Sequence, residues 1–189
     1  MFTHRFALIF IAIVLLTTAI AFAAPEAAPD TSFKTAPNVS FKASFEFTVP
    51  TTPDSAFDAM TGEIGMWWDH SFSEHPYALY IEPKPGGGFY EMFDSLGNGA
   101  KHASVILSNR GKQLTLDGPF GLSGLAITMV ASFRFSPVVD GTKIKVTVNN
   151  TGQLEPGKEE VIVTVWRHFM IEQYQPFIQS GKFRDKYKK

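Results

Sequence analysis

The chain has 189 residues, with 17 lysines and arginines against 18 aspartates and glutamates, and a formal net charge of −1 at pH 7. Such a near-neutral chain lacks the electrostatic footprint of a nucleic-acid-binding protein, so we expect no nucleic-acid partner. The absence of cysteine excludes disulfides and thiolate metal sites, and 18 phenylalanines indicate a large aromatic core or a cavity lined by rings.

Residues 1–23 have the pattern of an export signal. Arg5 precedes an apolar run over 6–20, which at about 15 residues is shorter than the ~20 that a membrane-spanning helix needs. Ala21-Phe22-Ala23 matches the small-x-small pattern of a cleavage site. Cleavage after Ala23 predicts a secreted or periplasmic protein without stable membrane insertion, and an uncleaved N-terminal anchor is the alternative.

A linker and a strand are expected to follow the signal. Residues 24–38 contain three prolines and no periodicity, which is typical of a disordered spacer. The domain itself is therefore expected to span 39–189. Its first element is predicted to be a strand over 39–49, because alternate residues from Val39 onward are apolar.

Two short helices are expected after this strand. Thr52 as the cap, Pro53 at the first helical position and Asp54 in the first turn predict the start of one helix, and 64–68 are expected to form the second. Strands separated by glycine- and proline-rich turns are then expected over 78–82, 89–93, 100–109, 113–117, 125–135 and 142–149.

The last segment, 158–180, is expected to be a long amphipathic helix, although its "VIVTV" favours a strand by propensity. Pro176 is expected to kink it or end its regular part, because its ring displaces a backbone hydrogen bond. One apolar series recurs at four-residue intervals: Ile162, Trp166, Met170 and Tyr174. The element order predicts an α+β fold in which a curved antiparallel sheet of about seven strands wraps around this helix and leaves a cavity between them.

Five segments carry a resemblance to a known family: "FEFTVPTTPDSAFDAMT", "IGMWWD", "IEPKPGGGFYEMFD", "KHASVI" and "LTLDGPFG". In this order they resemble the SRPBCC (START/Bet v 1-like) superfamily, in particular the branch related to the C-terminal domain of the Hsp90 ATPase activator. The resemblance implies a helix-grip fold over a hydrophobic pocket. It implies no single function, because such domains include lipid carriers, receptors, cyclases and co-chaperones. An export signal departs from the cytosolic role of that branch.

Four polar residues follow the paired tryptophans: Asp69, His70, Glu74 and His75. Imidazole and carboxylate groups suit zinc, but His70 and His75 are five residues apart in a stretch that reads as a loop. We interpret the stretch as a polar loop and expect no metal and no cofactor. His168 is interpreted as half of a solvent-side pair with Glu172, four positions on in the terminal helix.

Glu91 and His102 are the weak candidates for catalysis. If the strand face of Glu91 lines the cavity, its carboxyl lies in apolar surroundings with a raised pKa and could act as an acid or a polar anchor. If the register is reversed, Glu91 is solvated. His102 is expected to point outward, because Ala103, Val105 and Leu107 form the more apolar face of their strand.

We expect an exported protein that binds a small hydrophobic molecule reversibly, without chemistry. No nucleophile or phosphate-loop motif is found. One alternative is a cyclase- or hydrolase-type enzyme that uses Glu91, with or without His102, as acid or base, and another is a periplasmic protein-interaction or assembly module, whose protein partner the sequence does not name. Trp67 and Trp68 are expected to divide between core and cavity mouth, and packing of both in the core is the alternative. The expected ligand contacts are Trp67, Trp68, Phe89, Glu91, Phe93, Phe133, Phe135, Trp166, Phe169 and Met170.

Overall fold

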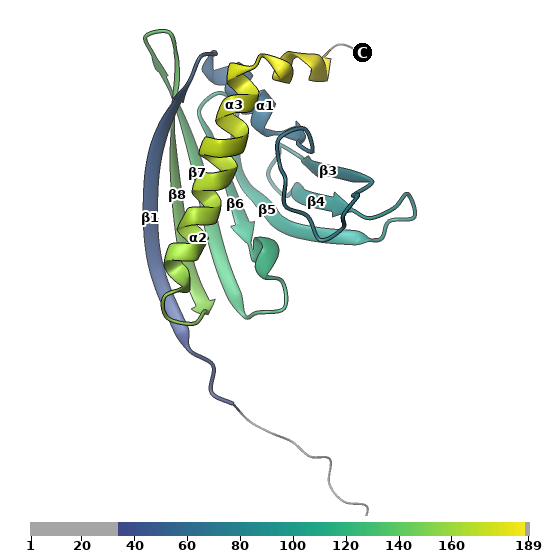
Figure 1. Cartoon of the computed structure of the whole chain (residues 1–189), viewed down its shortest axis with the longest axis vertical. Helices are drawn as coiled ribbons and strands as arrows, with labels where there is room; N and C mark the ends of the chain where they lie inside the picture. Colours follow the sequence, from purple (N-terminus) through teal and green to yellow (C-terminus); the bar gives the residue numbers. More distant parts are fainter. Residues whose placement is uncertain (1–33, 188–189) are drawn as a thin grey trace, which may run out of the picture. The chain divides into compact units, whose positions relative to one another are not determined.

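The computed structural model describes residues 34–187, so the predicted signal and most of the predicted linker lie outside the described residues. Within 34–187 the predicted α+β class is confirmed, since one curved antiparallel sheet packs against a C-terminal helix (Figure 1). No helix in this range is both long and apolar enough to cross a membrane.

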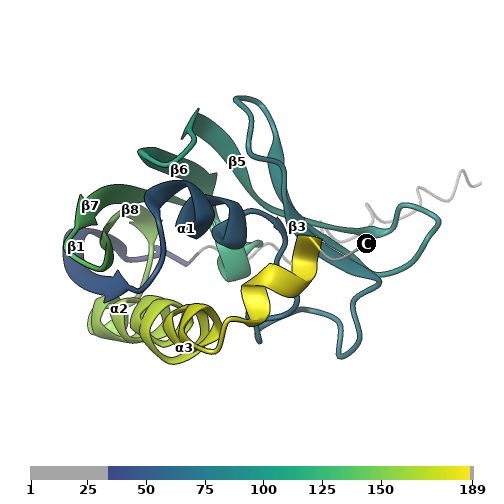
Figure 2. The same cartoon turned by 90° about the horizontal axis from the view of Figure 1, so that it is seen from above.

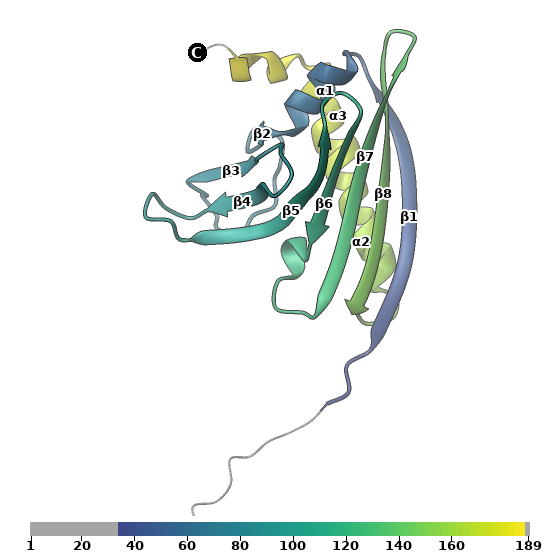
Figure 3. The same ribbon diagram turned by 180° about the vertical axis from the view of Figure 1, so that it is seen from behind.

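The sheet contains eight strands in the order β1-β8-β7-β6-β5-β4-β3-β2, and it is open, with β1 and β2 at its edges (Figure 3). It curves around the side that α1 and the terminal helix occupy (Figure 2). The sequence predicted about seven strands, one fewer than the structure contains. The missing strand is β2, whose two residues are too few to show an alternating pattern. The strands are β1 (Asn38–Val49), β2 (Gly62–Glu63), β3 (Ala78–Ile81), β4 (Gly88–Met92), β5 (Gly99–Asn109), β6 (Gln113–Gly118), β7 (Ile127–Val138) and β8 (Gly141–Gln153).

The first two predicted elements are confirmed. Along β1 every second side chain is exposed, and on the opposite face burial deepens until Phe47 and Val49 are buried. Helix α1 (Pro53–Met60) begins after Thr52, whose hydroxyl oxygen accepts a hydrogen bond from the Ser55 amide at 3.3 Å. This bond satisfies one of the free amide groups at the helix start, which is why threonine is favoured there.

The second predicted helix is wrong. Residues 64–68 form a single turn in which the amides of Trp67 and Trp68 both donate to the Ile64 carbonyl at 3.0 Å. The Ile64 amide itself donates to the Leu79 carbonyl at 2.9 Å, next to the pairing of β2 with β3. The sheet thus takes up the backbone immediately before the turn, and residues 69–77 continue as an irregular loop rather than as a helix.

The predicted terminal helix is present but not uniform. It consists of α2 (Lys158–Arg167), a π-helical segment η2 (His168–Tyr174) and α3 (Gln175–Gln179), and a 3-10 segment η3 (Lys182–Tyr187) follows. At the end of η2 the Gln175 amide donates to the Met170 carbonyl, five residues back. Pro176 does not end the helix, since α3 continues through it, and the irregularity is a widening of the helix just before this proline. Such π-helical turns are often found at functional sites.

Candidate functional site

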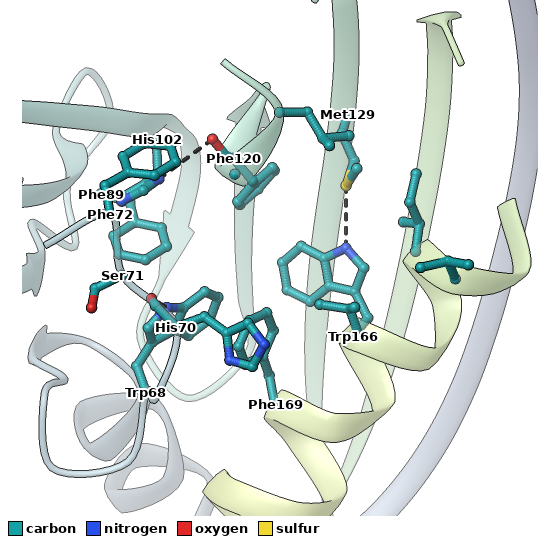
Figure 4. A pocket seen from close by; sticks show the side chains of 15 residues that line it. Trp68, His70, Ser71, Phe72, Phe89, His102, Phe120, Met129, Trp166 and Phe169 are labelled. Atoms are coloured by element: carbon teal, nitrogen blue, oxygen red, sulfur yellow. Dashed lines mark hydrogen bonds between the residues drawn. The ribbon is translucent and has the colours of Figure 1, made fainter. Parts of the chain in front are cut away.

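A cavity of about 340 Å³ lies between the concave face of the sheet and the terminal helix (Figure 4). This volume is within the range of about 300–1,000 Å³ that small-molecule sites occupy. The walls come from the loop between β2 and β3, which follows α1, from β4, β5 and β7, from the 3-10 turn η1 (Phe120–Leu122), and from α2 and η2. Six aromatic side chains line it: Trp68, Phe72, Phe89, Phe120, Trp166 and Phe169.

These rings hold one another in place. Trp68 is stacked on Phe169, with ring centroids 3.8 Å apart, and its edge meets Phe89 at 4.9 Å. Trp166 meets Phe120 at 5.1 Å, and its indole nitrogen donates to the sulfur of Met129 at 3.2 Å. Because five of the rings pack against one another and Phe72 packs against His102, contacts between different chain segments define the cavity.

The predicted ligand contacts fall into two groups, and the first lies at the cavity. Trp68, Phe89, Trp166 and Phe169 line it. Trp67 instead is buried in the core, where its indole nitrogen donates to the Ala59 carbonyl at 3.3 Å. The two tryptophans therefore divide between core and cavity as expected for adjacent side chains.

The predicted contacts of the second group do not line the cavity. Phe133, Phe135 and Met170 are buried in the core beside it, and Phe135 packs against Phe57 beneath α1. Phe93 was expected to point inward, but its side chain is 40% exposed. Strand β4 ends at Met92, so Phe93 begins the turn to β5 and no longer follows the inward face of the strand.

Behind the cavity wall, Glu91 on β4 is fully buried and accepts three hydrogen bonds. The amide of Phe72 and Nε2 of His102 donate to Oε2 at 3.0 and 2.9 Å, and the amide of Ser73 donates to Oε1 at 2.7 Å. Burial raises the pKa of Glu91, but these donors outweigh it and leave the pKa below its ordinary value. The expectation of a raised pKa was wrong, since the sequence did not show the two loop amides.

His102 points inward, contrary to the prediction. Phe89 pairs with Ala103 and Tyr90 with Lys101, so His102 is the extra residue of a β-bulge in β5. The bulge breaks the alternation, and His102 and Ala103 are both buried although they are consecutive. Bulges re-aim side chains in this way and are common beside functional sites.

Both ring nitrogens of His102 face acceptors. Nε2 bonds to the Glu91 carboxylate, and Nδ1 lies 3.4 Å from the Phe120 carbonyl. The ring also lies between Phe72 and Phe89, at centroid distances of 5.1 and 4.8 Å. Phe120 has a φ of 52°, a left-handed conformation that is rare for a bulky side chain, and this places its carbonyl near His102.

The lowered pKa of Glu91 predicts an acid-labile contribution to stability. A carboxyl whose pKa is lower in the folded than in the unfolded protein stabilises the fold at pH values above its ordinary pKa, which is 4.5 for glutamate. This contribution is lost as the pH falls through the folded-state pKa. We expect the difference in unfolding free energy between wild type and Glu91→Gln to shrink between about pH 5 and about pH 2. Urea unfolding over this range measures it, and a difference that grows on acidification would contradict the assignment.

At the cavity mouth, the neighbouring residues Asp69 and His70 meet His168 from the terminal helix. Asp69 Oδ1 lies 2.8 Å from Nδ1 of His70, which lines the cavity, and Asp69 Oδ2 lies 2.7 Å from Nε2 of His168. The predicted pair of His168 with Glu172 is confirmed, with Nδ1 2.8 Å from the carboxylate. The contact of His168 with Asp69, 99 residues earlier in the chain, was missed. Glu74, which the sequence grouped with Asp69, is not among the residues that gather here.

The charges of this cluster reinforce one another. Hydrogen bonds to Glu172 and Asp69 raise the pKa of His168 despite its partial burial. Burial raises the pKa of Asp69, but hydrogen bonds from His70 and His168 outweigh it, and the pKa is lowered. The cluster joins the loop after α1 to η2 across the mouth of the cavity.

No family model and no curated protein matches the chain. Among solved structures it is similar to an uncharacterized protein from Rhizobium leguminosarum, with a TM-score of 0.61 and 12% identity, covering 78% of this chain and 99% of that one. It is also similar to a protein of unknown function from Staphylococcus aureus (TM-score 0.54, 10% identity, 80% and 98% covered). A protein from Nitrosomonas europaea gives a TM-score of 0.53 at 16% identity, with 74% and 95% covered. At these identities the likeness shows the fold alone.

Proposed function

We propose that this protein is an exported helix-grip domain of the START/Bet v 1-like kind that holds a small, predominantly apolar molecule between its sheet and its terminal helix. The observation that carries the proposal is the ring-lined cavity of about 340 Å³. An apolar cavity with few polar groups is the usual form of a small-molecule site. Stacked and edge-on rings favour a ligand with a flat apolar skeleton.

One buried amide lies near the cavity without a hydrogen-bond partner among the described residues. Asn150 on β8 is buried, and neither its amide nitrogen nor its amide oxygen has a hydrogen-bond partner within residues 34–187. It is paired in register with Met129, whose side chain lines the cavity. Buried amides are nearly always bonded, but Asn150 is not among the residues that line the cavity, so a buried water is a simpler partner for it than the ligand.

The second candidate function is acid–base catalysis by His102, which lines the cavity, with Glu91 behind the wall 2.9 Å away. A histidine oriented by a carboxylate is a common general base. In this protein the nitrogen that would take the proton, Nδ1, faces the Phe120 carbonyl rather than open cavity. Catalysis would require the His102 ring to move so that Nδ1 faces the cavity. Reversible binding requires no such movement, so we favour it.

A cavity-filling substitution tests the binding proposal. Val165 lines the cavity from α2, whereas Val163, on the same helix, does not. Titrations of tryptophan fluorescence with fatty acids, sterols and planar aromatic compounds are expected to saturate for the wild type, because Trp68 and Trp166 line the cavity. Val165→Phe is expected to raise the dissociation constant of the best compound at least about tenfold, equivalent to about 1.4 kcal/mol. Val163→Phe is the matched control and is expected to leave it unchanged.

Two results would reject the binding proposal: no compound saturates the wild type, or both variants bind as well as the wild type does. The mass of each bound compound, measured after incubation, separates the two candidate functions. An unchanged mass supports binding, and a changed mass that depends on His102 supports catalysis.

A further inference from the structure

The side chains of Asp69, His70 and His168 gather at the cavity mouth. One ligand atom from each lies within 4.8 Å of the others. Two imidazoles and one carboxylate are the donor types that zinc takes in open, catalytic-type sites, with bonds of about 2.0–2.2 Å. In tetrahedral geometry such bonds separate neighbouring ligand atoms by about 3.4 Å. The gap of 2.7 Å between Asp69 Oδ2 and His168 Nε2 must therefore widen by less than an ångström.

The loop can provide this movement. Asp69 and His70 lie on an exposed stretch, with side-chain exposures of 39% and 57%, whereas His168 is held on η2. The two imidazole rings are already neighbours, with centroids 5.3 Å apart. A cation could therefore draw the loop residues onto a fixed histidine without disturbing the helix.

An independent observation is the partner on the far side of His168. Its Nδ1 bonds to the Glu172 carboxylate at 2.8 Å, while its Nε2 points to Asp69. Metal-bound histidines commonly donate their second ring N–H to a carboxylate, which fixes the tautomer and raises the basicity of the nitrogen that binds the metal. Glu172 is placed to do this, and Nε2 is the nitrogen that remains for a cation.

From this geometry we propose that Asp69, His70 and His168 bind a borderline divalent cation, Zn²⁺ in particular, with Glu172 as the supporting carboxylate. Three protein ligands leave at least one coordination position for water or for a donor atom of a second molecule. Because His70 also lines the cavity, this position lies at the cavity mouth. The metal site borders the cavity through His70, but none of the six rings is a ligand of the metal, so the two proposals can be tested separately.

The test uses the purified protein without a polyhistidine tag, stripped with a chelator and held at about pH 7, where histidine and carboxylate ligands are available to metals. Co²⁺ is added as the spectroscopic probe, and Zn²⁺ then displaces it. We expect visible d–d bands that saturate at one ion per chain and are abolished by Zn²⁺. His168→Gln is expected to remove the bands, and Glu172→Gln to weaken Zn²⁺ about 10- to 100-fold.

His75→Gln is the matched control, because His75 lies on the same exposed loop outside the ligand set. It is expected to bind both metals as the wild type does. A wild type without saturable bands would show a hydrogen-bonded network only and overturn the proposal. The proposal would also be overturned if His75→Gln lost the Co²⁺ bands as His168→Gln does, or if Glu172→Gln bound Zn²⁺ with full affinity. Circular dichroism of the metal-free variants checks folding, and these titrations need no apolar ligand, so failure of the metal site leaves the binding proposal standing.

Discussion

Replacing Glu91 with alanine is expected to lower the free energy of unfolding by about 3–5 kcal/mol, the range observed when one partner of a buried charged network is removed. The carboxylate is fully buried and is the shared acceptor for the amides of Phe72 and Ser73 and for His102. Its loss leaves the buried His102 ring and two part-buried loop amides without their acceptor, and an unpaired buried group costs about 1–3 kcal/mol. Urea unfolding at neutral pH measures the change.

Two further variants separate this network from a general effect of losing a glutamate. Glu46 on β1 is exposed and approaches Lys143 and Lys145 at 3.6 and 3.7 Å. Glu46→Ala is expected to change stability by less than about 1 kcal/mol, as exposed pairs generally do. Glu91→Gln keeps the volume and one acceptor oxygen, so we expect a loss between these two. Similar effects of Glu91→Ala and Glu46→Ala would show that Glu91 does not organise the loop.

Trp166→Ala is expected to cost about 3–5 kcal/mol of unfolding free energy, the usual range for deleting a large buried ring. The indole packs against Phe120, Phe133 and Phe169 and bonds to the sulfur of Met129. Its removal takes away a contact shared by the sheet, η1 and the terminal helix. Thermal or urea unfolding measures the change.

The control for Trp166 is Val161→Ala, on the same helix. Val161 also borders the cavity but is 53% exposed. Its truncation is expected to change stability by no more than about 0.5 kcal/mol, as at most surface positions. If Trp166→Ala proved equally mild, the ring cluster would be loosely packed and the cavity would not be preformed.

Local patterns were sufficient to predict most elements of the fold. The alternation along β1 and the capping threonine of α1 each report a physical requirement met within a few residues. The glycine- and proline-rich turns likewise separated the strands. Local patterns could not predict β2, because its two residues form a strand only through their pairing with β3.

The candidate site was harder to predict because its residues depend on irregular backbone. His102 faces the cavity through a bulge, and alternation within one strand cannot reveal an extra residue relative to its neighbour. The "GPFG" stretch reads as an ordinary turn, yet Phe120 takes a left-handed conformation there and contributes a ring and a carbonyl. The contact of His168 with Asp69 spans 99 positions, and only the folded chain brings them together.

The π-helical segment has a consequence for the angular phase of the terminal helix. An α-helix turns about 100° per residue, so side chains four positions apart drift by about 40° per step and by about 160° over four steps. A π-helix, at about 4.4 residues per turn, drifts in the opposite direction and cancels much of this rotation. Five side chains at four-residue spacing are thus all buried: Ile162, Trp166, Met170, Tyr174 and Ile178.

The packing of the helix therefore depends on how many residues η2 contains as well as on which residues they are. Removing one residue would rotate everything after it by about 100°. The Tyr174 hydroxyl, which donates to the Ala56 carbonyl at 2.6 Å, would then turn away from α1. Substitutions in this segment act on single contacts, whereas a change in its length would put the whole second half of the helix out of phase with the sheet.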